Sequence, residues 1–241
     1  MNVIISDIKD AIRFAFSDLK TVLFVGIVLC IISLLNKKVN LDDFDFAVRI
    51  IFNLLSFYIT GYGSYVTLKT IQENDKPPKI GHFRKLTWEG FKKTAIVAIY
   101  GIFLSYLFHL GKIHLSDNLL LASVFFALFI VLYAILITAL LNRYQHKGSF
   151  FQAFNFKKIF SLFKLFDLEN FILLFLAAIT SQLIIFTCYI DFSPNLTSIE
   201  MIHALLMVIL APFILLFCKR LIGLRSKKLL HNVSNWIEDN D

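Results

Sequence analysis

The chain has 241 residues, 58% of them hydrophobic and 27 of them phenylalanine, and its mean hydropathy is +0.73. A soluble globular domain cannot hide so large an apolar fraction in one core, so the composition excludes that class and indicates a protein surrounded mostly by lipid. In such a protein the net charge of +7 reports on membrane topology, and we expect no nucleic-acid partner.

The apolar runs predict six transmembrane helices, because about 20 helical residues cross the roughly 30 Å hydrocarbon core of a bilayer. The expected fold class is therefore all-α, a polytopic membrane helical bundle. An N-terminal run at 3–19 is interrupted by five charged residues and is followed by no small-residue cleavage motif, so we expect no signal peptide. The predicted spans are 21–36, 50–68, 94–111, 118–142, 170–190 and 201–218.

The segments before the first, third and fifth spans predict amphipathic helices. Apolar residues recur in steps of three and four over 5–19, 83–91 and 156–166, and cations take the opposite face. Helices of this kind lie at the headgroup boundary, so we expect about three of them on the cytoplasmic leaflet, facing anionic lipid. The cations assigned to this lipid interface are Arg13, Lys20, Arg84, Lys85, Lys92, Lys93, Lys157, Lys158 and Lys164.

Positive charge is distributed unevenly between the two sides of the predicted bundle. Twenty of the 24 Lys and Arg residues fall in the N-terminal segment, the two connectors after the second and fourth spans, and the C-terminal segment. The other side has Lys37, Lys38 and Lys112, and Arg49 lies at the edge of the second span. Because cations close to span ends remain in the cytoplasm, we expect a multi-pass protein of the cell membrane with both termini cytoplasmic.

The connectors recur about every 75 residues, which suggests three copies of a unit made of an interfacial helix, a span, an outer loop and a second span. Chance spacing is the alternative explanation. Because each unit would cross the bilayer twice, the copies would be parallel rather than inverted. The units would be 1–76, 77–147 and 148–225 within a single integral membrane domain, 1–225, followed by a cytoplasmic tail, 226–241.

Polar and small residues share one face of the second predicted span. Their steps of three and four residues place them within a stripe about 100° wide on a helix. Small residues and hydroxyls are typical of a helix-packing seam, whereas an ionisable residue at a span edge is a candidate for a polar pathway or a headgroup cavity. The candidate pathway residues are Arg49, Asn53, Ser56, Thr60, Ser64 and Thr67, with Gly63 on the same stripe and Gln182 in the fifth span.

Groups that could carry chemistry are sparse. No span core holds Asp or Glu, and the sequence has no phosphate-binding loop, zinc-protease motif or nucleophile elbow. His109 and His114 are five residues apart, which does not place two metal ligands on one helical face. The cysteines Cys30, Cys188 and Cys218 lie in apolar runs without metal or disulfide spacing. We therefore expect no metal, no cofactor, no catalytic residue and no enzymatic activity.

Two stretches of the sequence carry a recognisable pattern. The first is GYGSYVTLKTIQENDKPPKIGHFRKLTWEGFKKTAIVAIY, with Gly61-Tyr62, Pro77-Pro78 and Glu89-Gly90-Phe91-Lys92; the second is NRYQHKGSFFQAFNFKKIFSLF. Both resemble a family of archaeal and bacterial multi-pass membrane proteins catalogued only as a domain of unknown function. The chain departs from the family at Ile80-Gly81-His82-Phe83, where an acidic run is more usual. The resemblance implies a membrane location and a helical fold, and it implies no activity.

These features lead to two hypotheses about function. The first is a non-enzymatic protein that binds lipid, and anionic headgroups in particular, and that organises the membrane alone, as a homo-oligomer or with a membrane protein partner. The alternative is a permease-like channel or carrier that uses the polar face of the second span.

Overall fold

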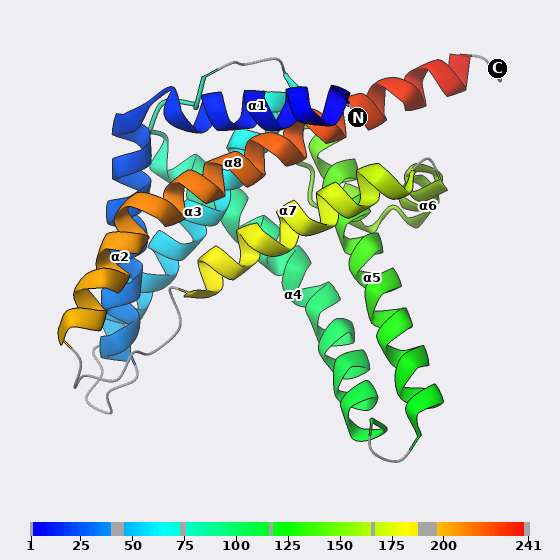
Figure 1. Ribbon diagram of the computed structural model, residues 1–241, viewed down its shortest axis with the longest axis horizontal. Helices are drawn as coiled ribbons and strands as arrows, with labels where there is room; N and C mark the ends of the chain where they lie inside the picture. The colour runs from blue at the N-terminus through cyan, green and yellow to red at the C-terminus, as the bar shows by residue number, and fades with distance from the viewer. Residues whose placement is uncertain are drawn as a thin grey trace. The chain divides into compact units, whose positions relative to one another are not determined.

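The computed structural model is helical throughout its described regular structure (Figure 1), which confirms the predicted all-α class. The described residues are 2–39, 46–72, 76–115, 118–164, 167–187 and 197–238. The elements in chain order are α1 (Asn2–Phe16), α2 (Leu19–Val39), α3 (Phe46–Ile71), α4 (Phe83–Ile113), α5 (Leu119–Gln145), η1 (Phe151–Phe154, a 3₁₀ turn), α6 (Phe156–Lys164), α7 (Leu168–Thr187) and α8 (Thr197–Glu238).

Several helices are long and apolar enough to cross a bilayer. Within the described residues these are α3, α4, α5 and the Leu206–Leu229 part of α8. The pair α1 and α2 meets the same criterion only when taken together, as one span bent by 78°, which gives up to five candidates. The apolar part of α7, Glu169–Ile185, is shorter. The helices are thus those of a membrane-inserted protein, and the count of six spans and the internal repeat stay predictions.

Two of the three predicted amphipathic helices exist as separate elements. A sharp bend separates α1 from α2, where Asp18 accepts hydrogen bonds from the backbone N–H of Thr21 (3.3 Å) and from its hydroxyl (2.7 Å). The second helix, α6, ends before Asp167, whose side chain accepts from the Asn170 N–H at 2.9 Å. Each acidic residue begins a new helix by satisfying an N–H that has no partner within that helix.

The prediction of a third separate helix, at 83–91, is wrong. The structure has one continuous helix, α4, from Phe83 to Ile113. No Asp, Ser or Pro lies between Phe83 and the predicted span start at residue 94, and Gly90 is accommodated within the helix. With 31 residues, α4 is about 46 Å long, so its first turns extend beyond a hydrocarbon core of about 30 Å.

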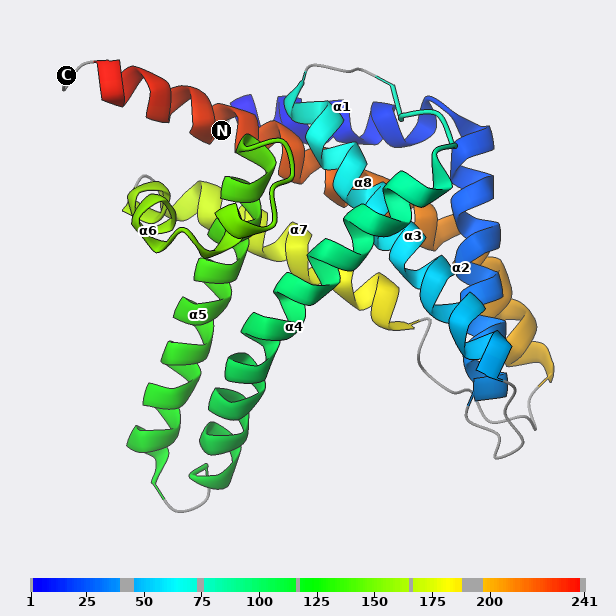
Figure 2. The same cartoon turned by 180° about the vertical axis from the view of Figure 1, so that it is seen from behind.

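The chain divides into two compact units, and the first combines Met1–Phe91 with Leu176–Lys228. In this unit α2, α3 and α8 pack alongside one another (Figures 1 and 2). Their shared core consists of side chains that are at most 2% exposed: Val25, Leu29, Ile59, Tyr62, Leu215 and Leu216. Helix α1 lies beside α8 in the same unit.

The second unit combines Lys92–Phe175 with Leu229–Asp241. Its part of α4 runs beside α5 as a helical hairpin (Figures 1 and 2), and Asn118 caps α5 by accepting from the Leu121 N–H at 3.1 Å. The connector after α5 packs back onto this hairpin. The Tyr100 hydroxyl donates to the Ala153 carbonyl at 2.9 Å, and the Asn142 amide donates to the Gln152 carbonyl at 2.7 Å.

Candidate functional site

Two glycines allow α3 and the first turns of α4 to cross at backbone contact. A Cβ atom on Gly90 would meet the Phe57 carbonyl oxygen and lie 2.8 Å from the Gly61 nitrogen. A Cβ atom on Gly61 would meet the Leu86 carbonyl oxygen and lie 2.8 Å from the Gly90 nitrogen. Small residues permit such an approach between apolar helices. The crossing thus brings together Gly61 and Gly90, which belong to the two ends of the first resembling stretch.

The polar turn between these helices is tied to α3 by one hydrogen bond. The Tyr62 hydroxyl donates to the Pro78 carbonyl at 3.0 Å, although the Tyr62 side chain itself is 1% exposed. The chain then enters α4 through His82, which has a positive φ of 51°. A non-glycine residue rarely adopts this conformation, so the backbone of the turn has an uncommon geometry at its junction with α4.

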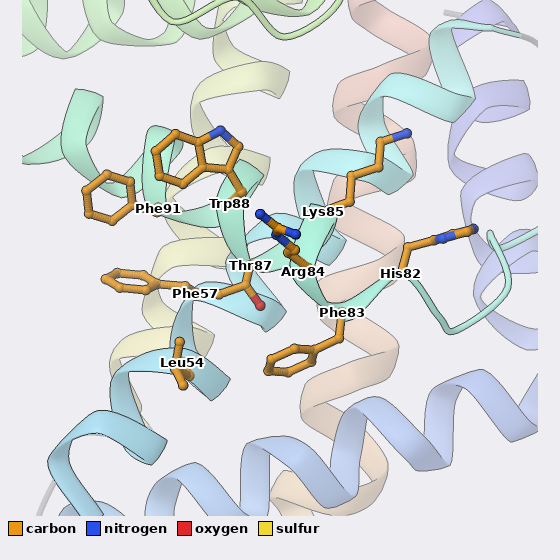
Figure 3. Close-up of a pocket in the computed structure, with 9 residues that line it drawn as sticks. All are labelled: Leu54, Phe57, His82, Phe83, Arg84, Lys85, Thr87, Trp88 and Phe91. Carbon is orange, nitrogen blue, oxygen red and sulfur yellow. The ribbon is translucent and has the colours of Figure 1, made fainter. Parts of the chain in front are cut away.

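A pocket of about 1030 Å³, here called the aromatic pocket, opens beside the crossing (Figure 3). The Trp88 and Phe91 rings stack with centroids 5.3 Å apart, and Phe57 meets Phe91 edge-on at 5.6 Å. Trp88 is 59% exposed and Phe83 49%, so these rings face the surroundings rather than a core. The lining residues are Leu54, Phe57, His82, Phe83, Arg84, Lys85, Thr87, Trp88 and Phe91.

The aromatic pocket combines this apolar surface with positive charge. Figure 3 shows the Arg84 guanidinium and the Lys85 chain on the side away from Leu54 and Phe57. The Thr87 hydroxyl oxygen is buried in the wall and has no hydrogen-bond partner among the described residues. A buried hydroxyl without a partner lowers the stability of the folded chain.

A second pocket of about 570 Å³, here called the basic pocket, adjoins the first and shares His82 with it. Two ammonium groups lie close to the Tyr65 ring, with Lys69 Nζ at 5.6 Å and Lys85 Nζ at 5.7 Å from its centroid. The described lining residues are Tyr65, Lys69, Lys76, Pro77, Pro78, Lys79 and His82. None of these is acidic, and Glu73 and Asp75 lie outside the described residues.

Residues 46–192 match the model of a protein family described as "Protein of unknown function (DUF4013)". This match covers more than half of the chain. The chain belongs to the DUF4013 family. No curated protein and no solved structure matches it.

The resemblance seen in the sequence is therefore confirmed, and the matched region can be compared with the geometry. Every lining residue of the two pockets and both glycines of the crossing lie in the DUF4013 region. Helices α1, α2 and α8 lie outside it. The two pockets are thus features of the family region of this chain.

The stripe on α3 divides into an exposed and a buried half. Arg49 and Asn53 are exposed, and Ser56 and Thr60 are half-buried. The other half faces α8 of the same unit: the Thr67 hydroxyl lies 3.3 Å from the Lys219 carbonyl oxygen, and a Cβ on Gly63 would lie 3.1 Å from Lys219 Cε. The buried members are Gly63, Ser64 (3% exposed) and Thr67 (1% exposed).

Gln182, the remaining candidate pathway residue, is half-buried on α7. Its neighbour Ser181 is fully buried and accepts a hydrogen bond from Lys219 Nζ at 2.8 Å. Lys219 is itself only 4% exposed. A lysine buried between α3 and α7 was not expected from the sequence, where its position next to Arg220 indicated the start of a cytoplasmic tail.

The cations assigned to the lipid interface also occupy several environments. Lys92 is half-buried and Lys93 is 3% exposed. The Lys158 ammonium lies 3.0 Å from His146 Nε2 in the second unit. The exposed members of the set are Arg13, Lys20, Arg84, Lys85, Lys157, Lys158 and Lys164.

A set of ion pairs between α1 and α8, here called the α1–α8 clasp, was not predicted. Asp7 lies 2.9 Å from Arg225 Nε and 2.7 Å from Lys228 Nζ, and Asp10 lies 2.9 Å from Arg220. Both Asp7 and Arg225 are almost fully buried. The amphipathic pattern of α1 gave no sign of these pairs, because the partners are more than 200 positions apart in the chain.

Metal binding finds no support in the described residues, because no three His, Cys, Asp or Glu side chains are grouped closely enough to hold an ion. His109 and His114 lie near the end of α4, where the His114 ring stacks on Phe125 at 5.8 Å. The candidate functional sites among the described residues are the aromatic pocket and the basic pocket.

Proposed function

We propose that this DUF4013 protein is a non-enzymatic membrane protein that binds an anionic lipid in the aromatic pocket. The proposal rests on one observation, the presence of Arg84 and Lys85 beside the exposed Phe83, Trp88 and Phe91 rings in a single cavity. A phospholipid has the same two-part character, with an anionic phosphate joined to apolar chains. The family match supplies no activity, so the argument depends on this geometry alone.

Physical chemistry supports such a ligand. Trp is enriched at headgroup depth because its ring is apolar and its N–H is polar. A guanidinium can bind phosphate through two parallel hydrogen bonds, and each basic residue near an anionic bilayer surface contributes about 1 kcal/mol. A groove of about 1030 Å³ is large enough for a glycerophosphate group and the first part of its chains.

The proposal includes a topology. Six spans with both termini in the cytoplasm would put the start of α4 at the cytoplasmic leaflet of the cell membrane. The uneven distribution of Lys and Arg supports this orientation. A lipid held at that leaflet would let the protein organise the surrounding membrane alone, as a homo-oligomer or with a membrane protein partner.

Lipids that co-purify with the protein test the proposal. Wild type and the Arg84→Gln/Lys85→Gln double variant would be purified from the same host in mild detergent, and retained phospholipids would be quantified by mass spectrometry. We expect anionic phospholipid above its share of the host membrane, and roughly 25-fold less in the variant, since each cation contributes about fivefold.

A Lys112→Gln variant is the control, because it removes one exposed cation from the far end of α4. It should retain the wild-type lipid profile. Identical profiles in wild type and the double variant would contradict the proposal.

A further inference from the structure

We propose that the basic pocket receives a second phosphate group, carried on the headgroup of the lipid whose glycerophosphate occupies the aromatic pocket. The inference rests on the proposed function and names the class of lipid that it selects: one with a phosphate on its headgroup in addition to the phosphodiester. It is carried by the shared wall of the two pockets at His82 and by the cations that line the second one.

The two pockets are neighbours that share one lining residue. His82 lines both of them. It has a left-handed backbone conformation and lies where the turn ends and α4 begins. Lys85 lines the aromatic pocket, and its ammonium lies 5.7 Å from the Tyr65 ring, which lines the basic pocket. A headgroup that leaves the first pocket past His82 and Lys85 therefore enters the second.

Positive charge is concentrated in the basic pocket. The Lys69 and Lys85 ammonium groups each lie close to the Tyr65 ring, at 5.6 and 5.7 Å from its centroid. Lys76 and Lys79 are exposed and line the same cavity. An anion held among these groups would offset their positive charge, and a phosphate monoester is suited to this because it carries about −1.5 to −2 charges at neutral pH.

The shape of the turn supports a site that exists before the ligand binds. Pro77 and Pro78 restrict the backbone, and the Tyr62 hydroxyl fixes the Pro78 carbonyl to α3. The turn that carries Lys76 and Lys79 is therefore anchored to α3 at Pro78. A cavity of about 570 Å³ has room for a phosphorylated headgroup rather than for a phosphate ion alone.

The test compares two lipids that differ only in the second phosphate. Full-length protein in detergent would be titrated with dioctanoyl phosphatidylinositol and with dioctanoyl phosphatidylinositol 4-phosphate. Fluorescence of Trp88 would be followed in a Trp236→Phe background, since these are the two tryptophans of the chain. We expect tighter binding of the 4-phosphate lipid, and a loss of about fivefold in that affinity for each of Lys69→Gln and Lys79→Gln.

Unchanged affinity for phosphatidylinositol in the two variants would show that they fold and that the aromatic pocket is intact. Lys112→Gln should leave the affinities for both lipids at their wild-type values. Equal affinity of wild type for the two lipids would overturn the inference while leaving the proposed function standing, as would a preference for the 4-phosphate lipid that survives in Lys69→Gln/Lys79→Gln.

Two other outcomes identify different failures. If neither inositol lipid binds better than dioctanoyl phosphatidylcholine, the proposed function itself fails. If soluble inositol 1,4-bisphosphate binds as tightly as the 4-phosphate lipid, the basic pocket binds a free phosphorylated ligand, and the assignment to a lipid is overturned.

Discussion

Gly90 shows how one residue sets the geometry of the candidate site. Its missing side chain allows the first turns of α4 to touch the Phe57 carbonyl and Gly61 on α3, and the aromatic pocket lies beside this contact. The sequence identified Gly61 and Gly90 as features of a family pattern. It could not show that they touch, because a small residue on a helix is compatible with contact, exposure or a bend.

We expect Gly90→Ala to lower the free energy of unfolding by about 1–3 kcal/mol, because the new methyl group would force the two backbones apart. Thermal unfolding of the purified protein in detergent measures the loss. Gly101→Ala on the same helix is the matched control, since a Cβ there meets nothing within 4 Å, and it should leave stability unchanged or slightly raised. Equal unfolding temperatures for the two variants would show that the crossing is not as tight as described.

Asp18 controls the start of α2 and gives a pH dependence. The hydrogen bond from the Thr21 hydroxyl, together with backbone N–H groups, lowers the pKa of the Asp18 carboxyl from its usual value. The ionised carboxylate therefore stabilises the folded state fully above the ordinary pKa of about 3.9, and this contribution is lost as the pH falls through the lower folded-state pKa.

Asp18→Ala should cost about 0.5–2 kcal/mol at neutral pH. Unfolding temperatures of wild type and Asp18→Ala should converge as the pH is lowered below 4. Asp18→Asn keeps an acceptor oxygen for the cap and should lose much less. A difference between wild type and Asp18→Ala that persists unchanged at low pH would refute the role of the carboxylate.

At the scale of elements, amphipathic periodicity predicted α1 and α6 but not the course of α4. A cap residue separates a surface helix from a span in the first case, whereas residues 83–93 contain no Asp, Ser or Pro and α4 continues through Gly90. The sequence likewise indicated no partners for the cations after the last span, yet α8 continues to Glu238 and carries Arg220, Arg225 and Lys228 onto α1. Ion pairs between helices that are far apart in the sequence produce no local sequence pattern that could predict them.

The α1–α8 clasp should hold α1 against the first unit. A double-mutant cycle on Asp7→Ala and Arg225→Ala should give a coupling energy of about 0.5–3 kcal/mol, because both side chains are buried. The matched pair is Asp10 and Arg220. The Asp10 side chain is 44% exposed, so the coupling energy of this pair should stay below about 1 kcal/mol. Additive effects of Asp7→Ala and Arg225→Ala on the free energy of unfolding would mean that this ion pair has no coupling energy.

At the scale of the whole molecule, composition and hydropathy were enough to predict a helical membrane protein, and two stretches of sequence carried the resemblance to its family. They were less able to count spans, because α2 passes the length and hydropathy criterion only together with α1, and the apolar part of α7 is short. The proposed topology puts both termini in the cytoplasm. The lipid-binding proposal expects the stripe on α3 to be covered by packing, whereas the permease alternative expects it to line a water-filled path.

Single cysteines in a background lacking Cys30, Cys188 and Cys218 would test these expectations with a membrane-impermeant thiol reagent applied to intact cells. We expect labelling at residue 112 and protection at residue 158, since the two lie on opposite sides of the proposed topology. Cysteines at Ser64 and Thr67 should be protected, because α8 covers them. Labelling at Ser64 and Thr67 would instead favour a water-filled path and the permease alternative.

The central claim is that an anionic lipid occupies the aromatic pocket, and quenching of Trp88 tests it most directly. Trp236→Phe protein would be reconstituted into phosphatidylcholine vesicles that contain either brominated phosphatidylglycerol or brominated phosphatidylcholine at the same mole fraction. Bromine on the chains quenches a tryptophan only on contact. We predict stronger quenching by the brominated phosphatidylglycerol, and loss of that preference in Arg84→Gln/Lys85→Gln. Equal quenching by the two brominated lipids in wild type would contradict the account.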